Sequence, residues 1–205
     1  MEEQTEQEEE KPRGVWVYFV AVFLMLLIVV YAVPKLTVKS DPTPKSVPGL
    51  ATIRSVFQLN TDFNQTLAYK QIDSAVQIDN PKIKAIANYI ATESCKTGGR
   101  ICYAKALYNF VRDNIEYLND PLRVEFIQVP ELTLATGGGD CDDGAVLLAS
   151  LLGSIGIRTE FVYKPNHVLL RAWLPEALKR YKKQDNWVYL DWTCNECEFG
   201  VVPPS

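Results

Sequence analysis

Residues 15–33 form a run of 19 consecutive apolar or aromatic residues, and this run constrains the chain more than any other feature. As an α-helix the run is long enough to cross a hydrocarbon core of about 30 Å. Trp16 and Tyr31 lie near its two ends, where aromatic residues suit the membrane interfaces. A cleaved signal peptide is the alternative, but its apolar region is usually about 7–15 residues long and ends in a small-x-small site, which residues 31–34 lack. We therefore expect an uncleaved transmembrane helix over residues 15–33.

The rest of the chain divides into a tail, a linker and one body. Residues 1–14, with six glutamates, are expected to form an acidic cytoplasmic tail, although basic residues flank both ends of the apolar run and leave its orientation open. Residues 34–49 contain four prolines and predict a stiff, extended stalk. A chain of 205 residues with 47% apolar composition can bury one sizeable core, so residues 50–205 are predicted to form one domain. Residues 14–205 balance at 19 acidic and 19 basic groups, which argues against nucleic-acid binding.

The five cysteines fall into two close pairs and a single residue, Cys141. Cys95 and Cys102 form one pair, and Cys194 and Cys197 the other. This count is expected for two disulfides and one free thiol, which favours a body outside the cytoplasm. Four cysteines allow three connectivities, so pairing within each close pair is only one possibility. A four-thiolate zinc site and four reduced, buried cysteines are the alternatives.

Helical periodicity comes before strand-like periodicity in the body. Apolar residues at helical spacing predict an amphipathic helix over residues 82–94, with Asn80 as its cap and Pro81 as its first residue. A second helix is expected to follow Gly99 and to stop before Asn119. The later elements expected are a buried helix over residues 145–155 and strands over Arg158–Tyr163, His167–Leu174 and Trp187–Asp191. Helices followed by an antiparallel sheet predict an α+β fold.

The only histidine in the chain, His167, follows Cys141 by 26 residues, and Asp191 ends a strand-like run 24 residues later. Thiol-based acyl transfer needs a nucleophile, a base that takes its proton and a carboxylate that orients the base. Cys141, His167 and Asp191 supply these three groups in that order. They are therefore the candidate catalytic residues.

Cys141 lies between three glycines and a predicted helix, in a turn rich in aspartate. Glycines 137–139 allow the backbone to turn sharply before the helix. The positive end of the helix dipole is expected to lower the pKa of the Cys141 thiol. Asp142 and Asp143 are expected to cap the first turn, although their charges oppose the thiolate, so an imidazolium partner is needed.

Antiparallel pairing of two predicted strands can bring His167 to Asp191. With these residues opposite each other, Leu174 falls opposite Gln184, which leaves a loop of nine residues, 175–183. Cys141 joins them only if the buried helix packs its N-terminus against this hairpin.

These residues resemble the transglutaminase-like superfamily, in which a cysteine on a helix faces a histidine and an aspartate on a sheet. The resemblance lies in residues 136–157, with Gly-Asp-Cys-x-Asp near their start, and continues at His167 and residues 187–191. Residues 106–117 are similar to the helix that precedes the motif in microbial members. The ending, residues 194–200, is similar to that of archaeal membrane-anchored members.

The resemblance implies a transglutaminase-like, papain-like core of N-terminal helices and an antiparallel sheet, preceded here by one transmembrane helix. It implies Cys141 as the nucleophile, His167 as base and then acid, and Asp191 as the orienting carboxylate. The backbone N–H of Cys141 would serve the oxyanion hole. Gln128 and Trp192 are candidates for its second donor, and neither is favoured.

We therefore expect a membrane-anchored Cys-His-Asp enzyme that hydrolyses peptide or isopeptide amide bonds through a thioester intermediate, without a cofactor or a metal. Microbial members of the superfamily more often resemble peptidases, which favours hydrolysis. Transfer to an amine, which cross-links proteins, is the first alternative, and a non-catalytic surface module that holds a peptide is the second. The expected partners are a protein or peptide substrate and the membrane. The expected location is the cell membrane, with a single span and the domain outside the cytoplasm.

Overall fold

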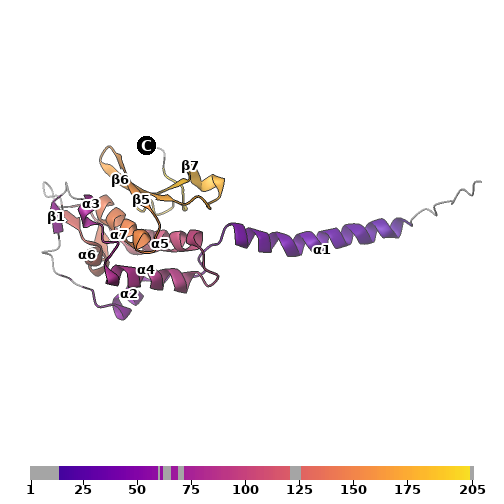
Figure 1. The fold of residues 1–205 in the computed structure, drawn as a ribbon, viewed down its shortest axis with the longest axis horizontal. Helices are drawn as coiled ribbons and strands as arrows, with labels where there is room; N and C mark the ends of the chain where they lie inside the picture. The colour runs from indigo at the N-terminus through magenta and orange to yellow at the C-terminus, as the bar shows by residue number, and fades with distance from the viewer. Residues whose placement is uncertain (1–13, 60, 62–65, 69–71, 121–125, 204–205) are drawn as a thin grey trace, which may run out of the picture. The chain divides into compact units, whose positions relative to one another are not determined.

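The structure, a computed structural model, describes residues 14–59, 61, 66–68, 72–120 and 126–203 (Figure 1). These residues form two units, one up to Ser40 and one from Asp41 onward, which are described separately. The expected acidic tail lies outside the described residues except for Gly14. The elements are α1 (Val15–Ser40), α2 (Leu50–Val56), β1 (Thr66–Ala68), α3 (Ile72–Ala75), α4 (Pro81–Ser94), α5 (Arg100–Asn114), β2 (Glu116–Tyr117), β3 (Phe126–Gln128), α6 (Pro130–Thr136), β4 (Gly138–Gly139), α7 (Cys141–Ser154), β5 (Thr159–Lys164), β6 (His167–Trp173), the 3-10 helix η2 (Lys179–Tyr181), β7 (Lys182–Gln184) and β8 (Trp187–Leu190).

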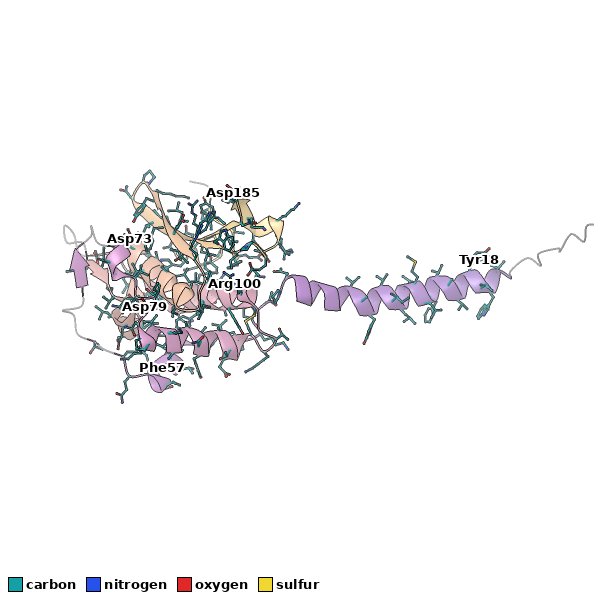
Figure 2. The ribbon with its side chains drawn as sticks, in the orientation of Figure 1. Tyr18, Phe57, Asp73, Asp79, Arg100 and Asp185 are labelled. Carbon is teal, nitrogen blue, oxygen red and sulfur yellow. A yellow bond between two sulfur atoms is a disulfide. The ribbon has the colours of Figure 1, made fainter. Side chains whose placement is uncertain are left out.

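The first unit contains one apolar helix, α1. Its segment Val15–Val33 has a mean hydropathy of 2.7, and none of this segment is buried. Side chains project outward along the helix, as Tyr18 does in Figure 2. By length and composition, α1 can be either a signal sequence or a single membrane anchor.

The segment 34–49 is not extended throughout, as a proline-rich stalk would be. Helix α1 continues through Pro34 to Ser40, because one proline removes a single helical hydrogen bond and residues 35–40 contain no further proline or glycine. The helix ends before Asp41, since Pro42 disfavours helical backbone at the residue that precedes it.

Asp41 fixes the start of the second unit to its core. Its carboxylate accepts hydrogen bonds from Lys105 Nζ at 2.5 Å and from Tyr181 Oη at 2.8 Å, and it also pairs with Arg180. Burial raises the pKa of Asp41, but the contacts with Lys105 and Tyr181 outweigh burial and lower that pKa overall. Residues 41–49 therefore belong to the folded unit rather than to a free linker.

Helix α7 lies at the centre of the second unit. Every residue from Asp142 to Leu152 is buried, as expected for a helix that is apolar almost all round. Helices α4, α5 and α6 pack against α7, and strands β5 and β6 cover it from another side. Figure 1 shows the sheet on one side of α5 and α7 and helix α4 on the other.

The helices that precede α7 begin where the sequence predicts. Asn80 caps α4 by accepting the N–H of Lys82 at 2.9 Å, and Pro81 is the first residue of the helix. Helix α5 starts after Gly99 but ends at Asn114, earlier than predicted, because residues 116–117 form strand β2. Strand β2 pairs in parallel with β4, a pairing that the sequence pattern did not indicate.

The main sheet has the strand order β5-β6-β8-β7, and all of its pairs are antiparallel. The turn between β7 and β8 uses Asp185 and Asn186 with φ of 40° and 69°, backbone angles that suit tight hairpins. The predicted α+β class, with helices first and an antiparallel sheet after them, is therefore confirmed.

Both close cysteine pairs are disulfides in the structure. Cys95–Cys102 joins the end of α4 to the start of α5, and Cys194–Cys197 closes a short loop after β8. The zinc-site and reduced-cysteine alternatives do not fit this arrangement, because all four sulfurs are bonded in pairs. Cys141 remains as a free thiol.

Candidate active site

Cys141 is the first residue of α7, and a capping box fixes the backbone around it. Asp140 is the cap, since its Oδ1 accepts the N–H groups of Asp142 at 3.1 Å and Asp143 at 3.5 Å. The Asp143 carboxylate in turn accepts the N–H of Asp140 at 3.3 Å. The expectation that Asp142 caps the helix is therefore wrong, because only the residue that precedes the first turn can reach these N–H groups. In the described part of the chain, the N–H of Cys141 donates to no other residue, so it is available to a ligand.

The three glycines before Cys141 have different roles. Only Gly137 has left-handed backbone, with φ of 74°, where it ends α6. Gly138 and Gly139 are extended and form β4. A Cβ on Gly139 would lie 2.6 Å from Asp143 Oδ2, so this glycine makes room for the capping carboxylate.

Gln128 supports the capping box from β3. Its backbone N–H donates to Asp143 Oδ1 at 2.7 Å, and its Nε2 donates to Asp143 Oδ2 at 2.9 Å and to the carbonyl of Gly138 at 3.3 Å. Both amide protons are therefore used, which removes Gln128 as a free donor for an oxyanion. Its position before the glycine-rich turn carried no sequence signal for this supporting role.

His167 and Asp191 are in direct contact, as the sequence pattern predicted. His167 Nε2 lies 3.1 Å from Asp191 Oδ2, and the side chains are 24% and 6% exposed, so the ring can reach a substrate while the carboxylate is shielded from water. The other oxygen, Asp191 Oδ1, accepts Thr193 Oγ1 at 2.7 Å and the Thr193 N–H at 3.3 Å. Thr193 was missed, although an Asp followed two residues later by Thr is a recognisable turn signal.

The register that joins these strands differs from the predicted one by two residues. Leu170 pairs with Leu190, so Asp191 falls opposite Leu169 rather than opposite His167. The segment predicted as a nine-residue loop contains η2 and most of β7, and β7 pairs with β8. A shift of two residues keeps each side chain on its face of the sheet, and diagonal neighbours remain within reach of each other. The contact between His167 and Asp191 therefore survives the shift.

Cys141 lies between the immediate neighbours of the other two residues. The backbone N–H of Val168 is near enough to the Cys141 sulfur to lower the pKa of the thiol, and the indole Nε1 of Trp192 donates to the Cys141 carbonyl at 3.1 Å. Trp192 reaches α7 because Gly144 has no side chain: a Cβ there would lie 2.5 Å from Trp192 Nε1. No hydrogen bond joins the Cys141 sulfur directly to the His167 ring among the contacts of the described residues. Because Trp192 already uses its only donor, it too is unsuited to bind an oxyanion.

Burial raises the pKa of the Cys141 thiol to about 11. The N–H of Val168 acts in the opposite direction, and the negative charges of Asp140 and Asp142 raise the pKa further. The expectation that the helix N-terminus lowers this pKa is therefore wrong, because desolvation and the neighbouring carboxylates dominate. The resting sulfur is a neutral thiol, so it needs a base at the moment of attack.

Three carboxyl groups beside Cys141 come within 4.8 Å of one another, those of Asp140, Asp142 and Asp143. Burial raises the pKa of Asp142 to about 9, and the contact with Asp140 adds to this effect. Burial also raises the pKa of Asp143 to about 7, although the hydrogen bond from the N–H of Gln128 acts to lower this pKa. Asp140 and Asp143 already cap the helix, and Asp142 is protonated at neutral pH. We therefore assign no metal to this cluster.

The second disulfide supports the aspartate end of the site. The carbonyl of Cys197 accepts Tyr108 Oη at 3.2 Å and Arg112 Nη1 at 2.8 Å, and Tyr108 Oη also donates to the Asp191 carbonyl at 3.1 Å. Burial raises the pKa of Tyr108 to about 12, so its hydroxyl remains a donor. These partners are more than 80 residues apart in sequence, and no local pattern indicates them.

Comparison with known proteins gives one family match. The model of the transglutaminase-like superfamily matches residues 84–192, more than half of the chain. A crystal structure described as a putative protease from Parabacteroides distasonis ATCC 8503 is similar over 69% of this chain, at 15% sequence identity and a TM-score of 0.44. The chain spans about a quarter of that protein's length, with 25% of it covered. Among the curated proteins, none matches this sequence significantly.

Proposed function

The chain belongs to the transglutaminase-like superfamily, and on this basis we propose that it is a thiol acyl-transfer enzyme with Cys141, His167 and Asp191 as its catalytic residues. The observation that carries the proposal is the 3.1 Å contact between His167 and Asp191, with the Cys141 sulfur near the backbone N–H of Val168, the residue next to His167. Asp191 holds Nε2 of the ring, which leaves Nδ1 for the sulfur. Because the Asp191 carboxylate is shielded from water, its hydrogen bond to the His167 ring is stronger than it would be in solvent.

The proposed reaction begins with a neutral thiol, because the pKa of Cys141 is about 11. His167 Nδ1 takes the thiol proton as the sulfur attacks the carbonyl carbon of an amide. The N–H of Cys141 donates to the oxygen on which negative charge develops. His167 then gives its proton to the leaving amine, and a thioester remains on Cys141. Water attacks the thioester with His167 as base, which releases the acid and restores the thiol.

We propose a peptide or isopeptide bond as the substrate and water as the acceptor. Members of this superfamily are usually cysteine peptidases, which favours hydrolysis over transfer. Transfer of the acyl group to an amine uses the same thioester, so cross-linking is the second candidate. The acceptor depends on whether an amine or water reaches the thioester first.

We also propose that α1 is retained as a single membrane anchor and that the catalytic domain lies outside the cytoplasm. The 19 residues of the apolar segment Val15–Val33 exceed the length usual for the apolar region of a signal peptide. The disulfides Cys95–Cys102 and Cys194–Cys197 support an oxidising compartment. Protease accessibility of the domain in intact cells or spheroplasts tests the orientation.

Turnover of a peptide and isopeptide library by the full-length chain, beside its Cys141→Ala variant, tests the proposed chemistry. We expect cleavage by the native chain and none by the variant. A primary amine added to the reaction separates the two acceptors, since hydrolysis yields a carboxylic acid and transfer yields a new amide. If both forms bind peptides but neither cleaves them, the chain is the non-catalytic binding module instead.

A further inference from the structure

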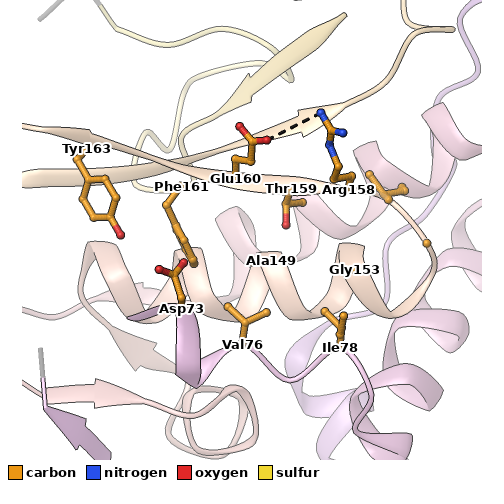
Figure 3. A pocket seen from close by; sticks show the side chains of 12 residues that line it. Asp73, Val76, Ile78, Ala149, Gly153, Arg158, Thr159, Glu160, Phe161 and Tyr163 are labelled. Carbon is orange, nitrogen blue, oxygen red and sulfur yellow. Dashed lines mark ion pairs between the residues drawn. The ribbon is translucent and has the colours of Figure 1, made fainter. Parts of the chain in front are cut away.

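A groove of about 730 Å³ runs alongside α7 at the open edge of the sheet. Strand β5 forms one wall, the second half of α7 forms the floor, and α3 with the loop after it forms the other wall (Figure 3). Val76 and Ile78 face β5 across the floor in Figure 3, and Ile78 is 45% exposed. An exposed aliphatic side chain in a groove suits an apolar group of a ligand.

Strand β5 is the edge of its sheet, because none of the described strands pairs with its outer side. The ladder with β6 fixes which backbone groups point outward. The N–H of Trp173 bonds to the carbonyl of Arg158, and alternate residues of β5 repeat this bonding. The backbone groups of Thr159 and Phe161 therefore point away from β6, where a further strand would pair with them.

The strand that lines the groove, β5, also pairs with the strand that carries His167. After Ser154 the chain turns back, so β5 runs antiparallel to α7 and its last residues lie beside the start of the helix. Tyr163 pairs with Val168, whose N–H is near enough to the Cys141 sulfur to lower the pKa of the thiol. Phe161 lines the groove and packs against the same apolar cluster as Cys141. Strand β5 therefore links the groove to the residues around the thiol.

Asp73 gives the groove a negative charge that no other described residue pairs with. The Asp73 carboxylate points toward Phe161 in Figure 3, and among the described residues no ion pair or side-chain hydrogen bond occupies it. Glu160 also lines the groove, but it is paired with Arg171 at 2.5 Å and with Arg158 at 3.9 Å. The charge that remains for a ligand is that of Asp73, which favours a basic group.

We propose that this groove binds the polypeptide substrate as an extended strand that pairs with the outer edge of β5 and places a lysine or arginine near Asp73. The inference rests on the proposed function. It adds the position of the bound substrate and the kind of side chain that the substrate carries. A strand advances about 3.4 Å per residue, so about four residues of peptide span Thr159 to Tyr163. Alternate side chains of such a peptide would face Val76 and Ile78.

Binding to the full-length Cys141→Ala variant tests the charge preference without turnover. The probes are two fluorescein-labelled octapeptides of alternating valine and threonine, one with lysine and one with glutamate at a central position. We expect the lysine peptide to bind about fivefold more tightly, as for an exposed ion pair. Asp73→Lys should reverse the preference. Asp79→Lys makes the same charge change at an exposed residue outside the groove lining and should leave the preference within about twofold.

Backbone methylation of the probe tests strand pairing and leaves the protein unaltered. A peptide strand paired with β5 directs every second N–H toward the sheet. N-methylation of these N–H groups should weaken binding at least about tenfold, whereas N-methylation of the other set of N–H groups should not. Equal effects of the two methylated sets, or a lysine preference that survives Asp73→Lys, would overturn the proposed groove.

Turnover measurements distinguish a failure of the proposed groove from a failure of the proposed function. Cys141-dependent cleavage that is indifferent to Asp73→Lys and to both methylated sets would reject the groove and keep the enzyme. Groove binding with the expected preferences but without any Cys141-dependent cleavage would keep the groove as a peptide site and reject the enzyme.

Discussion

Gly144→Ala should damage both stability and activity through Trp192. The added Cβ would lie 2.5 Å from Trp192 Nε1 and closer still to two carbons of the ring, so the indole must move by about 1 Å to restore ordinary contact. Trp192 is only 2% exposed, so the ring has no open space to enter. Overpacking of this kind costs about 1–3 kcal/mol. Loss of the bond from Nε1 to the Cys141 carbonyl adds about 1–3 kcal/mol.

We therefore expect Gly144→Ala to lower the free energy of unfolding by about 2–6 kcal/mol, a large part of the stability of an ordinary domain. Activity should fall on the order of a hundredfold, because the displaced indole adjoins Asp191 and contacts Cys141. Urea unfolding of the full-length chain in detergent, followed by circular dichroism, measures the first effect. Gly49→Ala is the control, since its Cβ would be 3.6 Å from Asn114 Oδ1, an ordinary contact. A Gly144→Ala midpoint equal to that of the control would mean that the added Cβ does not displace the Trp192 ring.

Three further predictions concern charge, covalent support and orientation. Burial raises the folded-state pKa of Asp142 to about 9, from an ordinary value of about 3.9, so the folded chain holds a proton that the unfolded chain releases. The free energy of unfolding should therefore fall as pH rises from about 4 to about 9. Asp142→Asn should flatten this fall in urea titrations at pH 5 and pH 9, and an unchanged slope would contradict the assignment. Replacing Cys194 and Cys197 together by Ser should cost about 2 kcal/mol and lower the turnover number, whereas wild-type values in unfolding and activity assays would count against it. Asp191→Asn should lower kcat on the order of a thousandfold while the circular dichroism spectrum is retained, because His167 loses its orienting charge; near-native turnover would be inconsistent with this role.

The parts of the fold that the sequence predicted depend on local patterns. Asn80 and Pro81 define the start of α4, and the run of apolar residues after Cys141 defines the buried helix α7. The contact between His167 and Asp191 was also predicted, although from the wrong register. It was recovered because strand periodicity is two, and an error of two residues keeps the same face of the sheet.

The parts that were missed depend on contacts between distant segments. The pKa of Cys141 depends on how deeply the thiol is buried, which a local helix pattern does not reveal. The support that Gln128 gives to the capping box comes from a strand that folds back onto the turn. Asp41 was assigned to a stalk, although Lys105, 64 residues later, binds it to the domain. Such pairings follow from tertiary packing rather than from periodicity.

In the proposed reaction, the Cys141 sulfur accepts an acyl group with the help of His167. Mass spectrometry of the full-length chain after brief exposure to p-nitrophenyl acetate, followed by peptide mapping, tests it most directly. We predict an acetyl thioester on Cys141 of the native chain, much slower labelling in His167→Ala, and none on this peptide in Cys141→Ala. Acetylation at other residues only, or equal labelling of Cys141 with and without the histidine, would contradict the account.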